Sequence, residues 1–145
     1  MSHVAKLEIE VKDLDALRKA AETLGLELRQ DQKTYKWWGY SVGDYPLPEG
    51  FKEKDLGKCD HALSLKDNPN AYEVGVVKNK DGRPGYTLLW DFYGGGYGLQ
   101  KAIGKDGNFL KQQYAKEVAK KKIPFGFKVT EKVVNNKIVL HAVRG

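Results

Sequence analysis

The sequence predicts an α+β domain in which two helices pack on one face of a mostly antiparallel sheet. Several segments alternate apolar and polar residues and are joined by turn signals, which is typical of antiparallel strands. The two segments with apolar residues at helical spacing are separated by a run of such strands, which favours α+β over a parallel sheet. The 145 residues are the length of one domain. The predicted order over the single domain 1–145 is β-α-β-β-β-β-β-α-β-β.

The first unit is a strand, a helix and a second strand. Residues 6–12 alternate strictly, which predicts a half-buried strand with Leu7, Ile9 and Val11 on the inner face. Apolar residues then recur at helical spacing over 14–24, with Asp13 in position to cap the helix and Gly25 in position to end it. Leu26 opens the next strand.

Aromatic residues dominate the next predicted strand, 34–42. Trp37 and Trp38 are adjacent, so a strand sends them to opposite faces, and we expect at least one to pack on the core. Prolines, glycines and mixed charges over 43–58 indicate a surface loop or insertion. A short strand over 62–65 follows it.

A β-hairpin and a glycine-rich segment stand at the centre of the chain. Strands are predicted over 72–77 and 86–91, joined by a turn that contains Asp-Gly at 81–82. Residues 90–98 then combine four aromatic residues with four glycines. Such a run is typical of backbone that approaches another group closely, and it can present N–H groups to a phosphate. The alternative is a flexible turn into the following helix.

A second long helix and a closing hairpin complete the chain. After a short helical turn over 99–103, we expect Asp106 or Asn108 to cap a helix that ends before Pro124. The hairpin pairs strands 127–133 and 138–143 around an Asn-Asn turn.

Charge is distributed unevenly along the chain. Residues 98–145 carry 11 Lys/Arg and 3 Asp/Glu, whereas residues 1–97 carry 14 and 16. A basic last third favours an anionic partner such as a nucleotide or a nucleic acid. The alternative is a solvated lysine surface, since only Arg144 in this region is an arginine, the better residue for bidentate phosphate contacts.

Cysteine content and hydropathy bear on location. The single cysteine, Cys59, cannot form an internal disulfide, which predicts a cytoplasmic protein and an inert thiol. There is no apolar run of membrane-spanning length and no secretory signal pattern, so we expect no membrane association.

Several short motifs along most of the chain agree in order and spacing with those of a known protein family. They are Met1-Ser2-His3, Lys12-Asp13-Leu14-Asp15-Ala16-Leu17, Trp38-Gly39-Tyr40, Tyr72-Glu73-Val74-Gly75-Val76, Tyr86-Thr87-Leu88-Leu89-Trp90-Asp91, Gln113-Tyr114-Ala115, Gly126-Phe127-Lys128-Val129 and Ile138-Val139-Leu140. By these motifs the chain resembles the conserved proteins that algal plastids and cyanobacteria encode as a hypothetical chloroplast reading frame, with relatives in bacteria and bacteriophages.

The chain departs from that family in two places. The loop 43–59 is longer than usual, and the glycine run 94–98 is closer to phage or bacterial members. The resemblance implies the fold, and it implies no mechanism, because the family has no established activity.

No catalytic or metal-binding motif is present in the sequence. The three histidines are far apart, and Cys59-Asp60-His61 is too small a group for zinc, so we expect neither a metal nor a cofactor. No phosphate loop or serine-nucleophile motif occurs. His3 and His141 could form an acid–base pair with Asp91 if the first and last strands meet, but ordinary half-buried histidines are the favoured interpretation.

The remaining hypothesis is a non-enzymatic binding protein for an anionic ligand with a base-like ring: a nucleotide, a nucleotide-derived signal or single-stranded nucleic acid. For a phage protein, capture of a host nucleotide signal is a sensible use of such a site. The predicted ligand-binding residues are Lys36, Trp37, Trp38, Tyr40, Trp90, Tyr93, Tyr97, Lys101, Lys105, His141 and Arg144. The alternative is a protein-interaction subunit or homo-oligomer whose exposed aromatic residues and edge strands dock a partner.

Overall fold

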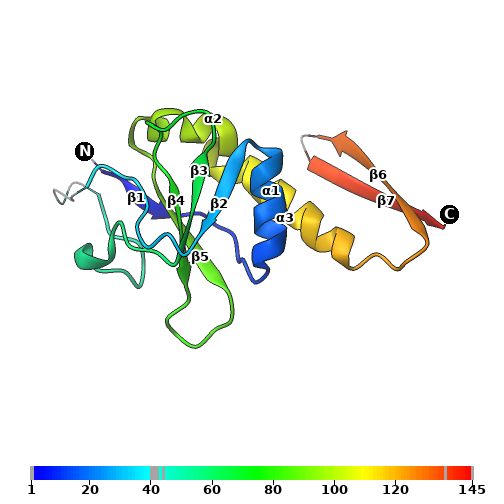
Figure 1. Cartoon of the computed structure of the whole chain (residues 1–145), viewed down its shortest axis with the longest axis horizontal. Coiled ribbons are helices and arrows are strands. Elements are labelled where there is room, and N and C mark those ends of the chain that lie inside the picture. The colour runs from blue at the N-terminus through cyan, green and yellow to red at the C-terminus, as the bar shows by residue number, and fades with distance from the viewer. Residues whose placement is uncertain (1, 40–42, 44, 136, 145) are drawn as a thin grey trace.

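A computed structural model describes residues 2–39, 43, 45–135 and 137–144. Five antiparallel strands form the main sheet in the order β1-β5-β4-β3-β2, and a separate hairpin forms a second sheet (Figure 1). The predicted α+β class is confirmed. The elements are β1 (Val4–Lys6), α1 (Leu14–Thr23), β2 (Leu26–Gln30), β3 (His61–Leu65), β4 (Val74–Lys78), β5 (Tyr86–Asp91), α2 (Leu99–Ile103), α3 (Asn108–Lys121), β6 (Phe127–Val134) and β7 (Lys137–Arg144).

The helices cover one face of the main sheet and bury the larger core against it. Leu17 of α1, Leu110 of α3 and Leu88 of β5 are fully buried there. The N-terminus of α1 is capped as predicted, because the Asp13 carboxylate accepts the N–H of Ala16 at 3.0 Å. Burial of this apolar stripe is the main term that holds the helices to the sheet.

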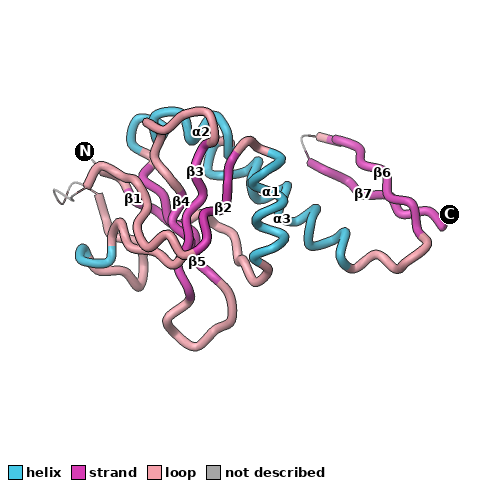
Figure 2. The backbone as a smooth tube through the Cα atoms, in the orientation of Figure 1, coloured by secondary structure: helices cyan, strands magenta, loops and turns pink. Residues whose placement is uncertain are grey.

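The opposite face of the sheet is covered by the long connection between β2 and β3, which Figure 2 draws to the left of the strands, mostly as loop with one short helical turn. Tyr35, Leu56 and Cys59 from this connection are buried against Val77 and Leu89. Part of the segment 43–58, predicted to be a surface loop, therefore forms a second core. Because both faces are covered, the first four residues of β4 are all buried.

Two strand predictions were wrong. Residues 6–12 do not form one strand, because β1 ends at Lys6 and the chain turns at Ile9, whose N–H donates to the carbonyl of Leu7 at 2.8 Å. Val11 returns to the sheet as an isolated bridge to Tyr86 and is buried, so the apolar alternation reflects burial in a bent segment.

The predicted strand 34–42 is also absent from its described part, where only Thr34 pairs, with Lys58. Side-chain carboxylates take the amides that a strand would use: Lys36 N–H donates to Glu73 at 2.8 Å. Local bonds of this kind compete with a β-ladder.

The start of α3 also differs from the prediction. Neither Asp106 nor Asn108 caps the helix; Gly107 occupies the N-cap position with a φ of 72°. A Cβ at Gly107 would lie 2.7 Å from the Leu7 side chain. Close packing against Leu7 therefore requires glycine at this turn.

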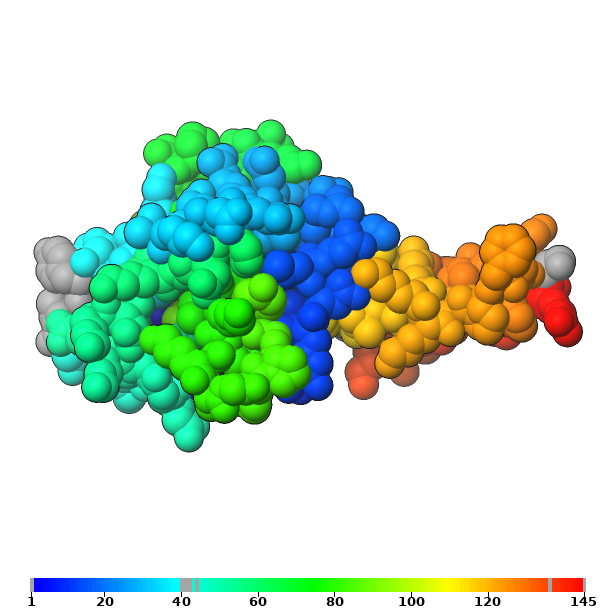
Figure 3. Space-filling view, turned by 60° about the horizontal axis from the view of Figure 1, so that its bottom comes forward, coloured from blue at the N-terminus to red at the C-terminus, as the bar shows by residue number. Residues whose placement is uncertain are grey.

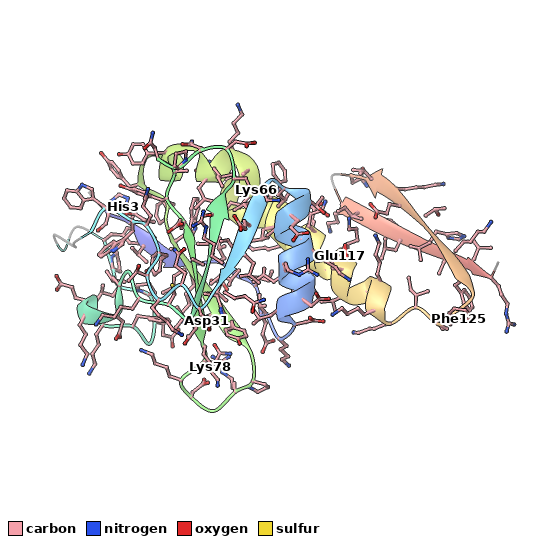
Figure 4. All side chains as sticks on the ribbon, viewed as in Figure 1. His3, Asp31, Lys66, Lys78, Glu117 and Phe125 are labelled. Carbon is pink, nitrogen blue, oxygen red and sulfur yellow. The ribbon has the colours of Figure 1, made fainter. Side chains whose placement is uncertain are left out.

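The closing hairpin β6–β7 forms as predicted but stands apart from the main sheet, beyond α3 (Figure 1). It is attached to α3 by Glu131, which lies 3.3 Å from the ammonium of Lys116 and 3.0 Å from that of Lys120. Phe125, in the connection from α3, is fully exposed and is labelled at the far end of the molecule in Figure 4.

Candidate ligand-binding site

Asp91, at the end of β5, fixes the chain segments around the site. Its side chain is fully buried, and Oδ1 accepts the backbone N–H groups of His3 at 2.9 Å and Tyr93 at 3.1 Å. Oδ2 accepts the N–H of Trp38 at 3.2 Å. Because all three donors are backbone amides, this carboxylate joins the N-terminus, the segment after Tyr35 and the glycine run.

The glycine run folds into a left-handed turn between β5 and α2. Gly94, Gly95, Gly96 and Tyr97 all have φ between 54° and 66°. Only glycine enters this conformation without a steric cost, so the run of three glycines allows the turn. The carbonyl of Gly96 accepts the N–H of Tyr72 at 2.9 Å, which ties the turn to the sheet.

The left-handed turn opens a shallow depression of about 550 Å³, here called the glycine basin. Its lining residues are Gly94, Gly95, Gly98, Gln100, Lys101, Gly104, Lys105 and Phe109. A side chain at Gly95 would contact Gln100, so the lack of side chains keeps the basin open. The basin offers two ammonium groups beside the half-exposed ring of Phe109.

A second hollow, of about 530 Å³, adjoins the basin and is here called the aromatic hollow. It is lined by Tyr45, Trp90 and Phe92, by Ala5, Lys6, Leu7 and Glu8 at the end of β1, and by Gln100, Lys105, Asp106 and Lys111. Gln100 and Lys105 line both depressions, so the two form one continuous surface. The volume of each depression lies in the range of small-molecule sites.

The rings of the aromatic hollow are held by one another. The Tyr45 ring packs edge-on against Phe92, with 5.2 Å between centroids, and the His3 ring lies 5.0 Å from Tyr45 and 5.4 Å from Phe92. His3 is labelled beside β1 in Figure 4. Such offset and edge contacts fix the orientation of aromatic side chains.

The lysines of this surface differ from those in the second half of α3. Within the described residues, no carboxylate lies within 4.0 Å of the ammonium groups of Lys6, Lys101, Lys105 or Lys111. Among the described residues the surface has four lysines and two acids, Glu8 and Asp106, so positive charge is in excess.

Further along α3 the lysines are engaged in ion pairs. Lys121 contacts Asp13 at 2.7 Å and Asp15 at 3.2 Å, while Lys116 and Lys120 contact Glu131. The basic character of the last third therefore serves partly to attach α3 to its neighbours. The lysines that line the two depressions on the β1–α2 side have no such ion pair among the described residues.

Three of the eleven predicted site residues line this surface: Trp90, Lys101 and Lys105. Tyr93 and Tyr97 lie on the left-handed turn and are exposed, but their rings pack on neighbours and line neither depression. Tyr93 lies edge-on to His3 at 5.3 Å, and Tyr97 lies edge-on to Tyr72 at 5.0 Å.

The described part of the early aromatic segment lines neither depression. Trp37 packs on the smaller core and Trp38 on the larger one, so both are half-buried and at least one packs on the core, as expected. The ammonium of Lys36 donates to the carbonyl of Pro69. Tyr40 lies outside the described residues.

His141 and Arg144 are on β7, at the opposite end of the molecule from β1 (Figure 1). The structure therefore separates them from the other predicted residues, and His141 does not approach His3 or Asp91. The cause is that the closing hairpin forms its own sheet instead of extending the main one.

Six cationic, aromatic or amide side chains that line the surface were not among the predicted site residues: Lys6, Tyr45, Phe92, Gln100, Phe109 and Lys111. Lys6 was interpreted only as the outer face of a strand, and Tyr45 as part of a surface loop. The one signal available was the clustering of Phe92 with the glycine run.

The single thiol of the chain is buried. Burial raises the pKa of the Cys59 thiol to about 12, and its Sγ lies 3.2 Å from the carbonyl of Gln32.

Among the described residues, no three His, Cys, Asp or Glu side chains are grouped as a metal site requires. No helix in the described chain is long and apolar enough to cross a membrane.

Comparison with known proteins returned no matching family model, no matching curated protein and no matching solved structure. The resemblance to the plastid and cyanobacterial reading-frame proteins therefore stays a prediction from the motifs.

Proposed function

We propose that this protein is a non-enzymatic binding protein for an anionic ligand that carries a base-like ring. The ligand class comprises nucleotides, nucleotide-derived signals and single-stranded nucleic acid. The observation that carries the proposal is the position of Lys105. Its side chain lines both the glycine basin and the aromatic hollow and has no described carboxylate within 4.0 Å.

The two depressions suit the two parts of such a ligand. Tyr45 and Phe92 offer ring surface in the aromatic hollow, where a base can stack, and a stacked base contributes about 1–3 kcal/mol. Lys101 and Lys105 offer charge to a phosphate beside the glycines, where the missing side chains allow close approach. Gln100 lies between the two and has both a donor and an acceptor for a base edge or a sugar hydroxyl.

The test is a titration of the purified protein with adenosine triphosphate and with a labelled oligothymidylate, each at about 20 and 200 mM salt. Saturable binding that weakens at the higher salt supports the proposal, because lysine–phosphate contacts release counterions. Absence of binding by both probes at low salt would overturn it, since a phosphate-driven complex is strongest there.

A second candidate is a homo-oligomer assembled through the β6–β7 hairpin, with a second copy of this chain as the partner. The observation in its favour is that Val133, Val134, Val139 and Val143 are exposed on this hairpin. Two strands alone are marginal, and pairing with the same edge of another copy would give a four-stranded sheet. Light scattering tests it: a monodisperse monomer at micromolar concentration removes this candidate.

A further inference from the structure

A second cationic hollow lies on the other side of Lys6, around the ring of Phe51. It encloses about 410 Å³ and is here called the Phe51 hollow. Its lining residues are Lys6, Glu49, Gly50, Phe51, Lys78, Asn79, Lys80, Asp81, Arg83 and Thr87. Figure 3 shows the face on which the turn after β4 adjoins the segment near residue 50, and Figure 4 labels Lys78 at this end of the sheet.

Two cations flank the Phe51 ring. The ammonium groups of Lys6 and Lys80 each lie 5.7 Å from its centroid, within the range of cation–π attraction. Phe51 is half-buried and packs against the smaller core, which holds its ring in place and leaves part of the side chain accessible. The arrangement places an aromatic surface directly beside positive charge.

Part of the charge in this hollow is already neutralised. Lys80 lies 3.5 Å from Asp55, and Arg83 pairs with Asp81. Among the described residues, no carboxylate lies within 4.0 Å of the ammonium groups of Lys6 or Lys78. These two lysines therefore supply the positive charge that a ligand phosphate would meet.

The Phe51 hollow is continuous with the proposed binding site. Lys6 lines both it and the aromatic hollow. Between them, β1 is the edge strand of the sheet, and a groove of about 360 Å³ runs beside it, lined by Val4–Lys6, Glu8 and residues 45–49. The glycine basin, the aromatic hollow, this groove and the Phe51 hollow form one path along β1.

Building on the proposed function, we infer that the ligand is a single-stranded nucleic acid of several nucleotides, which follows β1 from the glycine basin to the Phe51 hollow. Each depression alone has the volume of a site for one small ligand. A mononucleotide would leave the Phe51 hollow unused, whereas a strand places successive bases on Tyr45 and Phe51 with phosphates beside Lys105, Lys6 and Lys78. Repeated rings and cations along one groove are the common feature of proteins that bind single strands.

The test compares thymidine monophosphate with oligothymidylates of 2, 4, 8 and 12 nucleotides by fluorescence anisotropy or competition. We expect affinity to rise with length and then to reach a plateau. In Lys78→Gln, affinity for the 8-mer should fall about 3–10-fold and the log–log salt slope should decrease by about 0.7, the value for one lost phosphate contact on a single strand. Monophosphate binding should not change.

Lys54→Gln is the matched control. Lys54 is an exposed lysine in the β2–β3 connection, which also contains Phe51, and it lines none of the hollows. Phe51→Ala should weaken 8-mer binding about 10-fold through lost stacking. If that variant does not fold, as measured by circular dichroism, Lys78→Gln still decides the question, because Lys78 is exposed.

The outcomes separate this inference from the proposed function. Equal affinity for the monophosphate and the 8-mer, with no effect of Lys78→Gln, overturns the extended path and leaves the nucleotide site intact. Failure of every probe to bind at low salt overturns the proposed function itself.

Discussion

The Asp91 carboxylate and the backbone N–H of Trp38 are joined by a 3.2 Å hydrogen bond between residues 53 positions apart. The same carboxylate accepts amides from His3 and Tyr93. One buried acid therefore positions three backbone segments, at His3, Trp38 and Tyr93, through hydrogen bonds to its side chain. This arrangement makes Asp91 a structural residue beside the site, since every described donor to it is a main-chain group.

Replacing Asp91 by Asn should lower the free energy of unfolding by about 1–3 kcal/mol, because the amide NH₂ would face a buried N–H donor. Urea unfolding followed by tryptophan fluorescence measures the change. Asp67→Asn is the control, since Asp67 is an exposed carboxylate in the turn after β3. Equal stability of the two variants would show that the Asp91 contacts contribute little.

Gly75→Ala should destabilise the protein by about 1–3 kcal/mol through overpacking. The backbone at Gly75 is ordinary strand, but an added Cβ would overlap the ring of Tyr35, which is 2% exposed. In a Tyr35→Ala background the same change should cost almost nothing, because the ring is gone. A double-mutant cycle by thermal or urea unfolding measures this coupling; additive effects would contradict it.

Acid should destabilise the contact between α1 and α3. Hydrogen bonds from Arg18 and Lys121 lower the pKa of Asp15 to about 2, and Lys121 also lowers that of Asp13. A lowered pKa in the folded state means that the stabilisation is complete above the unfolded value near 4 and is lost as pH falls from 4 to 2. Lys121→Ala should flatten that dependence, measured by unfolding across this pH range, whereas the exposed neighbour Lys122→Ala should not.

Cys59 should resist alkylation in the folded protein. Desolvation by burial raises the pKa of its thiol to about 12, so very little thiolate is present at pH 8. Iodoacetamide labelling followed by mass spectrometry should be slow in buffer and rapid in 8 M urea. Rapid labelling in buffer would show that the β2–β3 connection opens readily.

Lys105→Gln should weaken binding of the oligothymidylate about 3–10-fold at low salt, because Lys105 serves both the glycine basin and the aromatic hollow. Tyr45→Ala should weaken it through lost stacking, with a smaller dependence on salt. Anisotropy titrations measure both. Lys122→Gln, on the far end of α3, is the control that should leave affinity unchanged, and an equal loss in that variant would indicate binding through net charge alone.

Patterns in the sequence correctly predicted the elements that are stabilised by contacts between residues close together in the chain. The Asp13 cap, the helical row ending before Gly25 and the hairpin strands β4 and β5 all follow from residues close together in the chain. The predicted strand 34–42 failed because its amides bind Glu73 and Asp91, acceptors that are distant in sequence. The periodicity of apolar residues along the sequence carries no information about such long-range hydrogen bonds.

The site was predicted only in part for the same reason. Lys101 and Lys105 were identified through charge near the glycine run, and Trp90 through the aromatic cluster. Lys6 and Tyr45 reach the site because β1 pairs with β5 and the β2–β3 connection folds back over the sheet. Those approaches are fixed by tertiary packing, so local composition could not show that Trp37 and Arg144 line neither depression.

The pairing of β1 with β5 has a consequence for synthesis on the ribosome. Val4 lies opposite Asp91, so the first strand of the main sheet waits for β5, the last strand of that sheet to be made. At 5–20 residues per second that delay is roughly 4–17 s, during which the nascent N-terminal segment has no edge to join. Because the chain is made from its N-terminus, β1 pairs with β5 late. The groove beside β1 is therefore also assembled late.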